Sequence, residues 1–335
     1  MGVDLPILWA IIIVFGLMMY VVMDGFDLGI GLLFPFIRDR AERDLMVNTV
    51  APVWDGNETW LVLGGAGLFA AFPLAYSVLL SALYLPLVFM LIGLILRGVA
   101  FEFRFKADAA HRPIWDLSFA IGSYVATFCQ GIALGAFING FRMNGLTYAG
   151  GAFDWLTPFS IFTGFGLIVA YGLLGACWLI MKTEDALQRR MIELARPLTL
   201  LLLIVIGIVS LWTPLAHPQI ASRWFSLPNI VFFAPVPVLT LATAWAILYV
   251  LQRQPHALPF GLALFLLFLG YSGLGISLWP HIVPPAMSLD QAAAPPQSMG
   301  FALVGALFII PIILTYTFWS YYVFRGKVKF GEGYH

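Results

Sequence analysis

Residues 6–36 read PILWAIIIVFGLMMYVVMDGFDLGIGLLFPF. A helix that crosses a bilayer needs about 20 mostly apolar residues, and this stretch exceeds that length with only two charged side chains, Asp24 and Asp27. The residues before it contain no cluster of positive charge and no small-residue cleavage site. We therefore expect a retained first membrane span rather than a cleaved signal peptide.

The rest of the chain has the same character. Of its 335 residues 61% are hydrophobic and 10% are charged, and the mean hydropathy is +0.93. A soluble domain is roughly a quarter charged, so this composition predicts an all-α polytopic membrane protein made of one integral membrane domain, residues 1–335. The net charge of zero gives no electrostatic support for nucleic-acid binding. The nine expected spans cover residues 6–36, 55–73, 76–103, 117–140, 157–181, 196–215, 227–251, 257–279 and 299–324.

The basic residues predict how these spans are oriented. With nine spans, 15 of the 17 Lys and Arg residues fall on one side, and only Arg142 and Arg223 fall on the other. Loops rich in Lys and Arg stay in the cytoplasm, so we expect the N-terminus in the periplasm and the C-terminus in the cytoplasm. The 15 residues are Arg38, Arg40, Arg43, Arg97, Arg104, Lys106, Arg112, Lys182, Arg189, Arg190, Arg196, Arg253, Arg325, Lys327 and Lys329.

Ionisable side chains within the spans are the candidate functional residues, because burying them in a membrane is costly. Asp24 and Asp27 are three residues apart, which places both on one face of the first span. A pair of acids at that depth must be protonated, paired with a base or exposed to water. The alternative is a structural pair that is hydrogen-bonded to other helices.

Two further acids and an arginine lie near the predicted cytoplasmic ends. Asp55 and Glu58 have the D-x-x-E spacing of a capping box, so they either cap the second span, serve as proton acceptors at its cytoplasmic mouth, or do both. Arg97, near the end of the third span, either reaches the interface or pairs with Asp27, Asp55 or Glu102.

Other kinds of site lack support in the sequence. Cys129 and Cys177 lie in apolar segments and form no CxxC motif, which favours buried packing residues. The five histidines lie in loops or at span ends, whereas a haem held between helices needs facing ligands at one depth. We find no metal-ligand cluster and no nucleotide-binding motif. The histidines are His111, His217, His256, His281 and His335.

Three runs together resemble subunit II of the cytochrome bd-type quinol oxidases, a family that includes the cyanide-insensitive oxidases. They are MDGFDLGIG (23–31), APVWDGNETWLVLGGAGLFAAFP (51–73) and LRGVAFEFR (96–104). The resemblance covers the whole chain and is strongest over residues 20–140. It implies two four-helix bundles plus one peripheral helix.

The resemblance also implies a function. The family couples oxidation of a membrane quinol, such as ubiquinol, to the reduction of O₂ to water in the bacterial inner membrane. Haems b and d and the quinol-oxidising loop belong to the partner, subunit I, so this chain is expected to bind no metal and no haem itself and to contain no catalytic residue. Some members hold a structural quinone, and the sequence decides neither this nor whether a small accessory single-span subunit is present.

In this family, acids of subunit II help to line a cytoplasmic proton path. By motif, those positions are Asp55 and Asp27. Asp24, Arg97 and Glu102 fall in equivalent runs, and Glu58 stands where other members can have a neutral residue. We expect Asp55 to relay protons from the cytoplasm, Asp27 to lie deeper, and Arg97 to balance the charge. A proton-coupled secondary transporter and a purely structural partner subunit are the alternatives.

Overall fold

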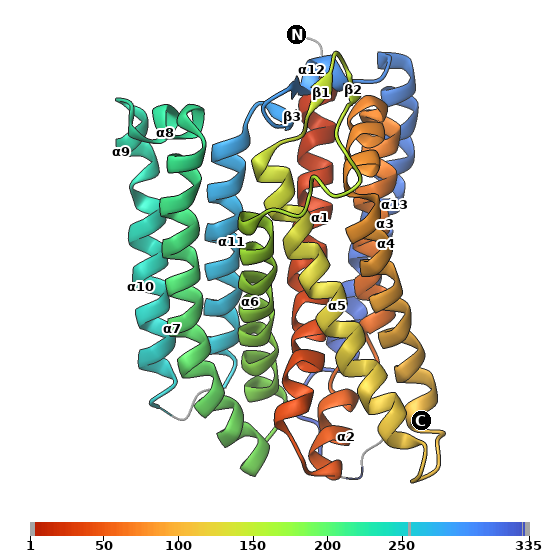
Figure 1. Cartoon of the computed structure of the whole chain (residues 1–335). Coiled ribbons are helices and arrows are strands. Elements are labelled where there is room, and N and C mark those ends of the chain that lie inside the picture. The colour runs from red at the N-terminus through yellow and green to blue at the C-terminus, as the bar shows by residue number, and fades with distance from the viewer. Residues whose placement is uncertain (1–3, 254–255, 330, 332–335) are drawn as a thin grey trace.

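Long, nearly parallel helices make up the computed structural model, which describes residues 4–253, 256–329 and 331 (Figure 1). Among these residues, eight helical segments are long and apolar enough to cross a membrane. They are α1 (Leu5–Leu33) with the 3₁₀ turn η1 (Phe34–Phe36), α4 (Pro73–Arg104), α5 (Arg112–Asn139), α6 (Pro158–Lys182), α7 (Asp185–Ala216), α9 (Asn229–Phe233) with α10 (Pro235–Val250), α11 (Leu258–Leu278) and α13 (Pro296–Val323).

The ninth predicted span, residues 55–73, is also a helix, but it differs from the others. Helix α3 (Trp54–Ala71) has 18 residues, and its first turns carry Asp55, Asn57 and Glu58. It is therefore too polar to qualify by length and hydropathy alone, although it packs along α1. The all-α membrane fold is confirmed, and the count of nine spans is approximate.

The helices pack as the resemblance implies. Helices α1, α3, α4 and α5 form one group, α6, α7, α10 and α11 form another, and α13 lies against α3 at the edge. The first group joins the second where α6 packs against both α1 and α5, and at the α1–α6 crossing Gly29 and Gly175 let the two backbones touch. Small residues at such crossings allow the close approach that holds membrane helices together.

Short elements connect the helices at the two ends. Helix α2 (Arg40–Asn48) lies in the connection between α1 and α3, and Asp39 caps it by accepting a hydrogen bond from the Glu42 nitrogen at 3.0 Å. Helix α7 begins 11 residues before the predicted span at 196, because hydropathy does not register its polar first turns. At the opposite end lie β1 (Met143–Asn144), β2 (Thr147–Tyr148), α8 (Pro218–Phe225), β3 (His281–Val283), β4 (Met287–Ser288) and α12 (Leu289–Ala292).

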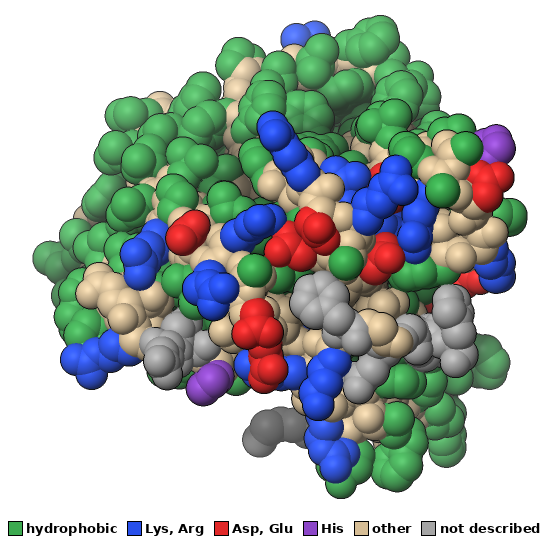
Figure 2. Space-filling view, turned by 90° about the horizontal axis from the view of Figure 1, so that it is seen from below, with side chains coloured by type: hydrophobic (Ala, Val, Ile, Leu, Met, Phe, Trp, Pro, Cys, Tyr) green, Lys and Arg blue, Asp and Glu red, His purple; other side chains and the backbone are tan. Residues whose placement is uncertain are grey.

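Charged side chains gather at the end of the molecule that holds α2 (Figure 2). Arg104 is buried there between Asp44 of α2, at 2.7 Å, and Asp116 of α5, at 2.6 Å. Asp44 also pairs with Arg112, and Asp116 with Arg43. These ion pairs tie the loop helix to two long helices, so the basic end of the bundle is an ordered surface.

We predict that Gly29→Ala destabilises the protein. An added Cβ would lie 2.8 Å from the Gly175 nitrogen and closer still to the Tyr171 carbonyl, so α1 and α6 would have to separate. Overpacking of this kind costs about 1–3 kcal/mol. Gly270→Ala is the matched control, because a Cβ there meets nothing within 4 Å. Thermal unfolding in detergent should show a lower midpoint for Gly29→Ala alone, and equal midpoints would contradict this packing.

Candidate functional site

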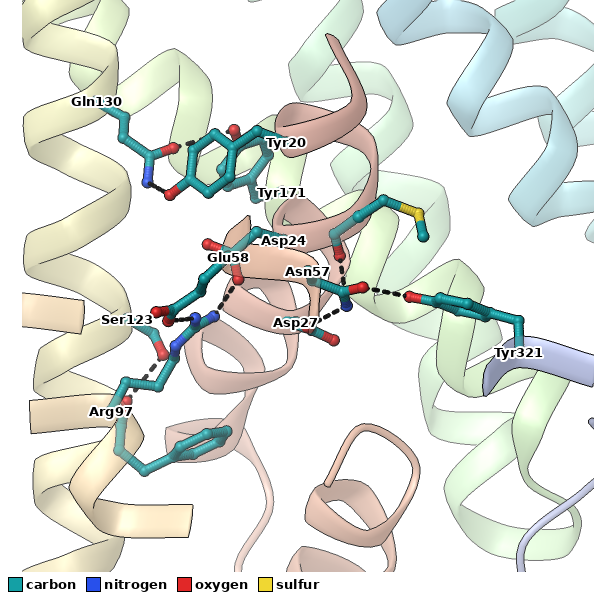
Figure 3. A network of polar contacts seen from close by, with 12 residues as sticks. Tyr20, Asp24, Asp27, Asn57, Glu58, Arg97, Ser123, Gln130, Tyr171 and Tyr321 are labelled. Atoms are coloured by element: carbon teal, nitrogen blue, oxygen red, sulfur yellow. Dashed lines mark hydrogen bonds and ion pairs between the residues drawn. The ribbon is translucent and has the colours of Figure 1, made fainter. Parts of the chain in front are cut away.

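Arg97 of α4 lies fully buried between two acids from other helices (Figure 3). Its guanidinium donates to Asp24 Oδ1 of α1 at 2.6 Å and to Glu58 Oε1 of α3. The expectation that Arg97 needs an acidic partner is confirmed. The partners expected from the sequence, Asp27, Asp55 and Glu102, are wrong, because the rotation of each helix about its axis turns Asp24 and Glu58 toward α4 instead.

Asp27 is held by amide and phenol groups rather than by the arginine. The Asn57 side chain of α3 donates to Asp27 Oδ2 at 2.7 Å and to the Met23 carbonyl at 3.3 Å. The Tyr321 hydroxyl of α13 in turn donates to Asn57 Oδ1 at 2.8 Å. Asp27 and Asn57 are both buried, so the second acid of DGFD and the asparagine of WDGN form one polar unit across α1 and α3.

A second chain of polar side chains lies one turn from Asp24, on the side away from Arg97 (Figure 3). Tyr171 of α6 donates to Gln130 Oε1 of α5 at 3.1 Å, and Gln130 donates to the Tyr20 hydroxyl of α1 at 2.7 Å. Tyr20 precedes Asp24 by four residues and so lies on the same face of α1. Six helices, α1, α3, α4, α5, α6 and α13, therefore contribute polar groups to this region of the bundle.

The charges of this cluster do not cancel if every group is ionised. Three carboxyls, those of Asp24, Asp27 and Glu58, lie around the single guanidinium of Arg97. Asp24 Oδ2, Asp27 Oδ1 and Arg97 Nε are buried and have no hydrogen-bond partner among the described residues. An uncompensated charge in a low-dielectric interior is strongly unfavourable, so a proton on one of these carboxyls would reduce the imbalance of charge. The site is therefore chemically suited to hold and exchange protons.

The structure moves the other two predicted acids away from this cluster. Helix α3 begins at Trp54 without a side-chain cap, so the expected capping box between Asp55 and Glu58 is wrong. Asp55 is exposed in the first turn of α3, and Glu58 reaches Arg97 instead of the backbone. Glu102 is exposed and pairs with Lys106 at 3.6 Å, because it lies on the outer face of α4.

The sequence analysis missed the neutral members of the cluster. Asn57 and Gln130 are amides within helices of the bundle, and a buried amide requires hydrogen-bond partners. An amide side chain within a predicted span could therefore have identified these two residues. Tyr20, Tyr171 and Tyr321 gave no comparable signal, because tyrosines are common in membrane helices at the interfaces.

The described residues do not suit a haem held by facing histidines. His111, His217, His256 and His281 lie at helix ends or in the β3–β4 segment, and His111 bonds to Asp108 at 2.8 Å. His335 lies outside the described residues. No group of three or more His, Cys, Asp or Glu side chains in the described part of the chain could hold a metal ion.

Comparison with known proteins agrees with the fold and with the motifs at this site. The sequence profile of the cytochrome bd terminal oxidase subunit II family matches residues 5–324. The chain belongs to this family. It is 30% identical to a probable cytochrome oxidase subunit 2 of Haemophilus influenzae, over 97% of this chain and 95% of that protein. It is 28% identical to the cytochrome bd-I ubiquinol oxidase subunit 2 of Escherichia coli, with the same coverage.

Further relatives extend this result. The cytochrome bd ubiquinol oxidase subunit 2 of Bacillus subtilis is 28% identical, with 97% of each chain covered. The solved structure of the bd oxidase from Geobacillus thermodenitrificans contains a chain with the same fold, at a TM-score of 0.76 and 16% identity, covering 93% of this chain and 97% of that one. This bd oxidase subunit II is thus a multi-pass bacterial membrane protein and one subunit of a haem-containing oxidase that also has a haem-bearing subunit I.

We predict that Arg97→Gln strongly destabilises this subunit. Removing one partner of a buried ion pair leaves a charge uncompensated, which costs about 3–5 kcal/mol. Adding Asp24→Asn to the same chain removes the stranded carboxylate and should recover part of the loss. The yield and thermal midpoint of the purified oxidase measure both effects. If Arg97→Gln has the thermal midpoint of the wild type, removing Arg97 does not destabilise the subunit and the prediction is wrong.

Proposed function

We propose that this chain is the haem-free subunit of a cytochrome bd-type quinol oxidase, that it stabilises the haem-bearing subunit I, and that it supplies a cytoplasmic path for proton uptake. The observation that carries the proposal is the buried cluster of Arg97 with three carboxyls. The quinol oxidation and O₂ reduction are assigned to the partner, whose haems supply the redox chemistry. The positions of the described histidines support a haem-free chain.

The charged end of the molecule is assigned to the cytoplasm. The connections α1–α3, α4–α5, α6–α7 and α10–α11 and the segment after α13 all lie at this end, and they contain the basic loops identified from the sequence. Positively charged loops remain on the cytoplasmic side during insertion. We therefore propose that α1 starts in the periplasm and that α13 ends in the cytoplasm.

The order of the acids along the proposed path follows from their exposure. Asp55 is exposed in the first turn of α3, the helix that follows the loop helix α2. Glu58 lies one turn deeper, and its side chain is 27% exposed. Asp24 and Asp27 are fully buried beyond it. A proton would therefore pass from Asp55 to Glu58 and then to Asp24 and Asp27, while Arg97 keeps the cluster from accumulating negative charge.

The stoichiometry of O₂ reduction explains why the oxidase needs a path for proton uptake. Each O₂ reduced to two waters consumes four protons. If these protons come from the cytoplasm and the protons of the quinol leave outside, charge is separated without a pump. Through an apolar bundle, protons require a series of ionisable groups or waters, since hydrocarbon offers no hydrogen bonds.

A purely structural role is the second candidate, and the full burial of the pair between Asp24 and Arg97 favours it. A buried ion pair can fix how helices pack without moving protons. In that case, neutral substitutions would alter stability and leave proton kinetics unchanged.

We predict that Glu58→Gln slows turnover of the assembled oxidase by on the order of a hundredfold, the lower range for loss of a positioned proton-transfer group. The amide still accepts a hydrogen bond from Arg97 but cannot carry a proton. Glu193→Gln, at an exposed acid of α7 near the same end, is the matched control. Oxygen consumption and proton uptake are measured at equal haem content. Wild-type rates for Glu58→Gln would exclude Glu58 from the path.

Asp55→Asn tests the outermost position of the path. We expect slower proton uptake with all haem signals retained, because the exposed Asp55 side chain makes no hydrogen bond or ion pair within the described chain that could affect folding. Normal uptake at normal haem content would remove Asp55 from the proposal. Loss of the haem signals would indicate failed assembly and a structural role.

Cysteine labelling of intact spheroplasts tests the orientation. Ala109→Cys, in the exposed loop before α5, should resist a membrane-impermeant maleimide until the cells are opened. Leu146→Cys, in the exposed turn between β1 and β2, should react at once, and the native Cys129 and Cys177 are buried. The reverse pattern would contradict the assignment.

A further inference from the structure

Tyr321 links the last helix of the chain to the acids of the first. It lies near the end of α13, and its hydroxyl meets the Asn57 side chain, 264 residues away in sequence. Its ring packs edge-to-face on Phe26 of α1 and on Trp178 of α6, with ring centroids 6.4 and 6.1 Å apart. The Tyr321 hydroxyl points toward Asn57 (Figure 3).

The hydrogen bonds that link Tyr321, Asn57 and Asp27 can each run in only one direction, because some of these groups can donate and others can only accept. The Met23 carbonyl can only accept, so the nitrogen of the Asn57 amide must face α1. Its two hydrogens then serve Met23 and Asp27 Oδ2, and its oxygen faces Tyr321. An amide oxygen can only accept, so the Tyr321 hydroxyl is the donor.

This polarity distinguishes the two oxygens of Asp27. Oδ2 accepts from Asn57 and therefore carries no hydrogen of its own in that contact. Oδ1 is buried and has no partner among the described residues, so it is the atom on which a proton can reside. We infer that Tyr321 is a positioning residue which, through Asn57, makes Oδ1 the oxygen of Asp27 that takes up and releases protons. The inference rests on the proposed role of Asp27 in proton uptake.

The segment that follows α13 holds Tyr321 in place. Lys182, at the end of α6, donates to the carbonyls of Phe324 and Gly326 at 2.6 and 3.1 Å. The Val328 nitrogen donates to the Lys182 carbonyl at 2.9 Å. Helix α13 touches the rest of the fold sparingly, so these bonds set where its last turn lies. Through Tyr321 and Asn57, the segment after α13 thereby helps to position the Asp27 carboxyl.

Infrared spectroscopy of the assembled oxidase provides the test. In protein labelled with heavy-carbon aspartate, the difference between wild type and Asp27→Asn isolates the carboxyl band of Asp27. Tyr321→Phe keeps the ring and removes only the hydroxyl, so the Asn57 amide loses its donor and can rotate. We expect a shifted or broadened Asp27 band, together with turnover slowed roughly two- to tenfold, the effect of one lost hydrogen bond.

Tyr124→Phe is the matched control, because it removes a hydroxyl of α5 that bonds to the Leu32 carbonyl at 2.9 Å, away from the acids. It should leave the Asp27 band unchanged. Lys182→Met is a second variant, which removes two of the hydrogen bonds that hold the segment after α13 and should also broaden the band.

The results separate this inference from the proposed function. An Asp27 band that is identical in wild type, Tyr321→Phe and Lys182→Met overturns the inference, as does the absence of a protonated Asp27 band in every redox state. Normal proton uptake by Asp27→Asn refutes the role of Asp27 in the path. An Asp27 band that changes in Tyr321→Phe would still establish that Tyr321 positions the Asp27 carboxyl.

Discussion

The charge of Arg97 must be compensated inside a bundle that excludes water, and the arrangement of the first helices depends on this constraint. A guanidinium keeps its charge at any pH that a protein meets, so its neighbours must adapt to it. Asp24 of α1 and Glu58 of α3 both reach Arg97 of α4, and Asp27 lies near them because it is one turn further along α1. The ion pairs form because the helices pack together, and they also stabilise that packing.

Neutral side chains determine how the surplus acid behaves. Amide groups border the cluster on two sides, Gln130 of α5 next to Tyr20 and Asn57 of α3 next to Tyr321, and an amide donates hydrogen bonds without readily passing protons on. Glu58 is the one carboxyl of the three with an exposed surface, so the proposed path has a single mouth, on the side of α3 that bears Asp55. The hydrogen bonds of Asn57 and the ion pairs of Arg97 hold the acids in one geometry, which a relay requires.

Hydropathy predicted nearly all of the helices, because each must cover its own backbone with apolar side chains in lipid. It missed the polar first turns of α7 and could not show that α3 is less apolar than its neighbours. The acids and Arg97 were predicted as a set, since charges within spans are rare. Their pairing was not, because it depends on how each helix is rotated about its axis. Tyr321 was beyond prediction, since its partner lies 264 residues away and only the folded chain brings the two together.

The buried carboxyls are proposed to exchange protons with the cytoplasm. Hydrogen–deuterium exchange at those groups in proteoliposomes tests this, with heavy water added only on the cytoplasmic side and the carboxyl bands followed by infrared spectroscopy. We expect the bands of the buried acids to move to their deuterated positions as fast as mixing allows, and Glu58→Gln to delay this change. Bands that stay unchanged for hours in an active, intact oxidase would show that the cluster is sealed, and the role of this subunit would then be structural.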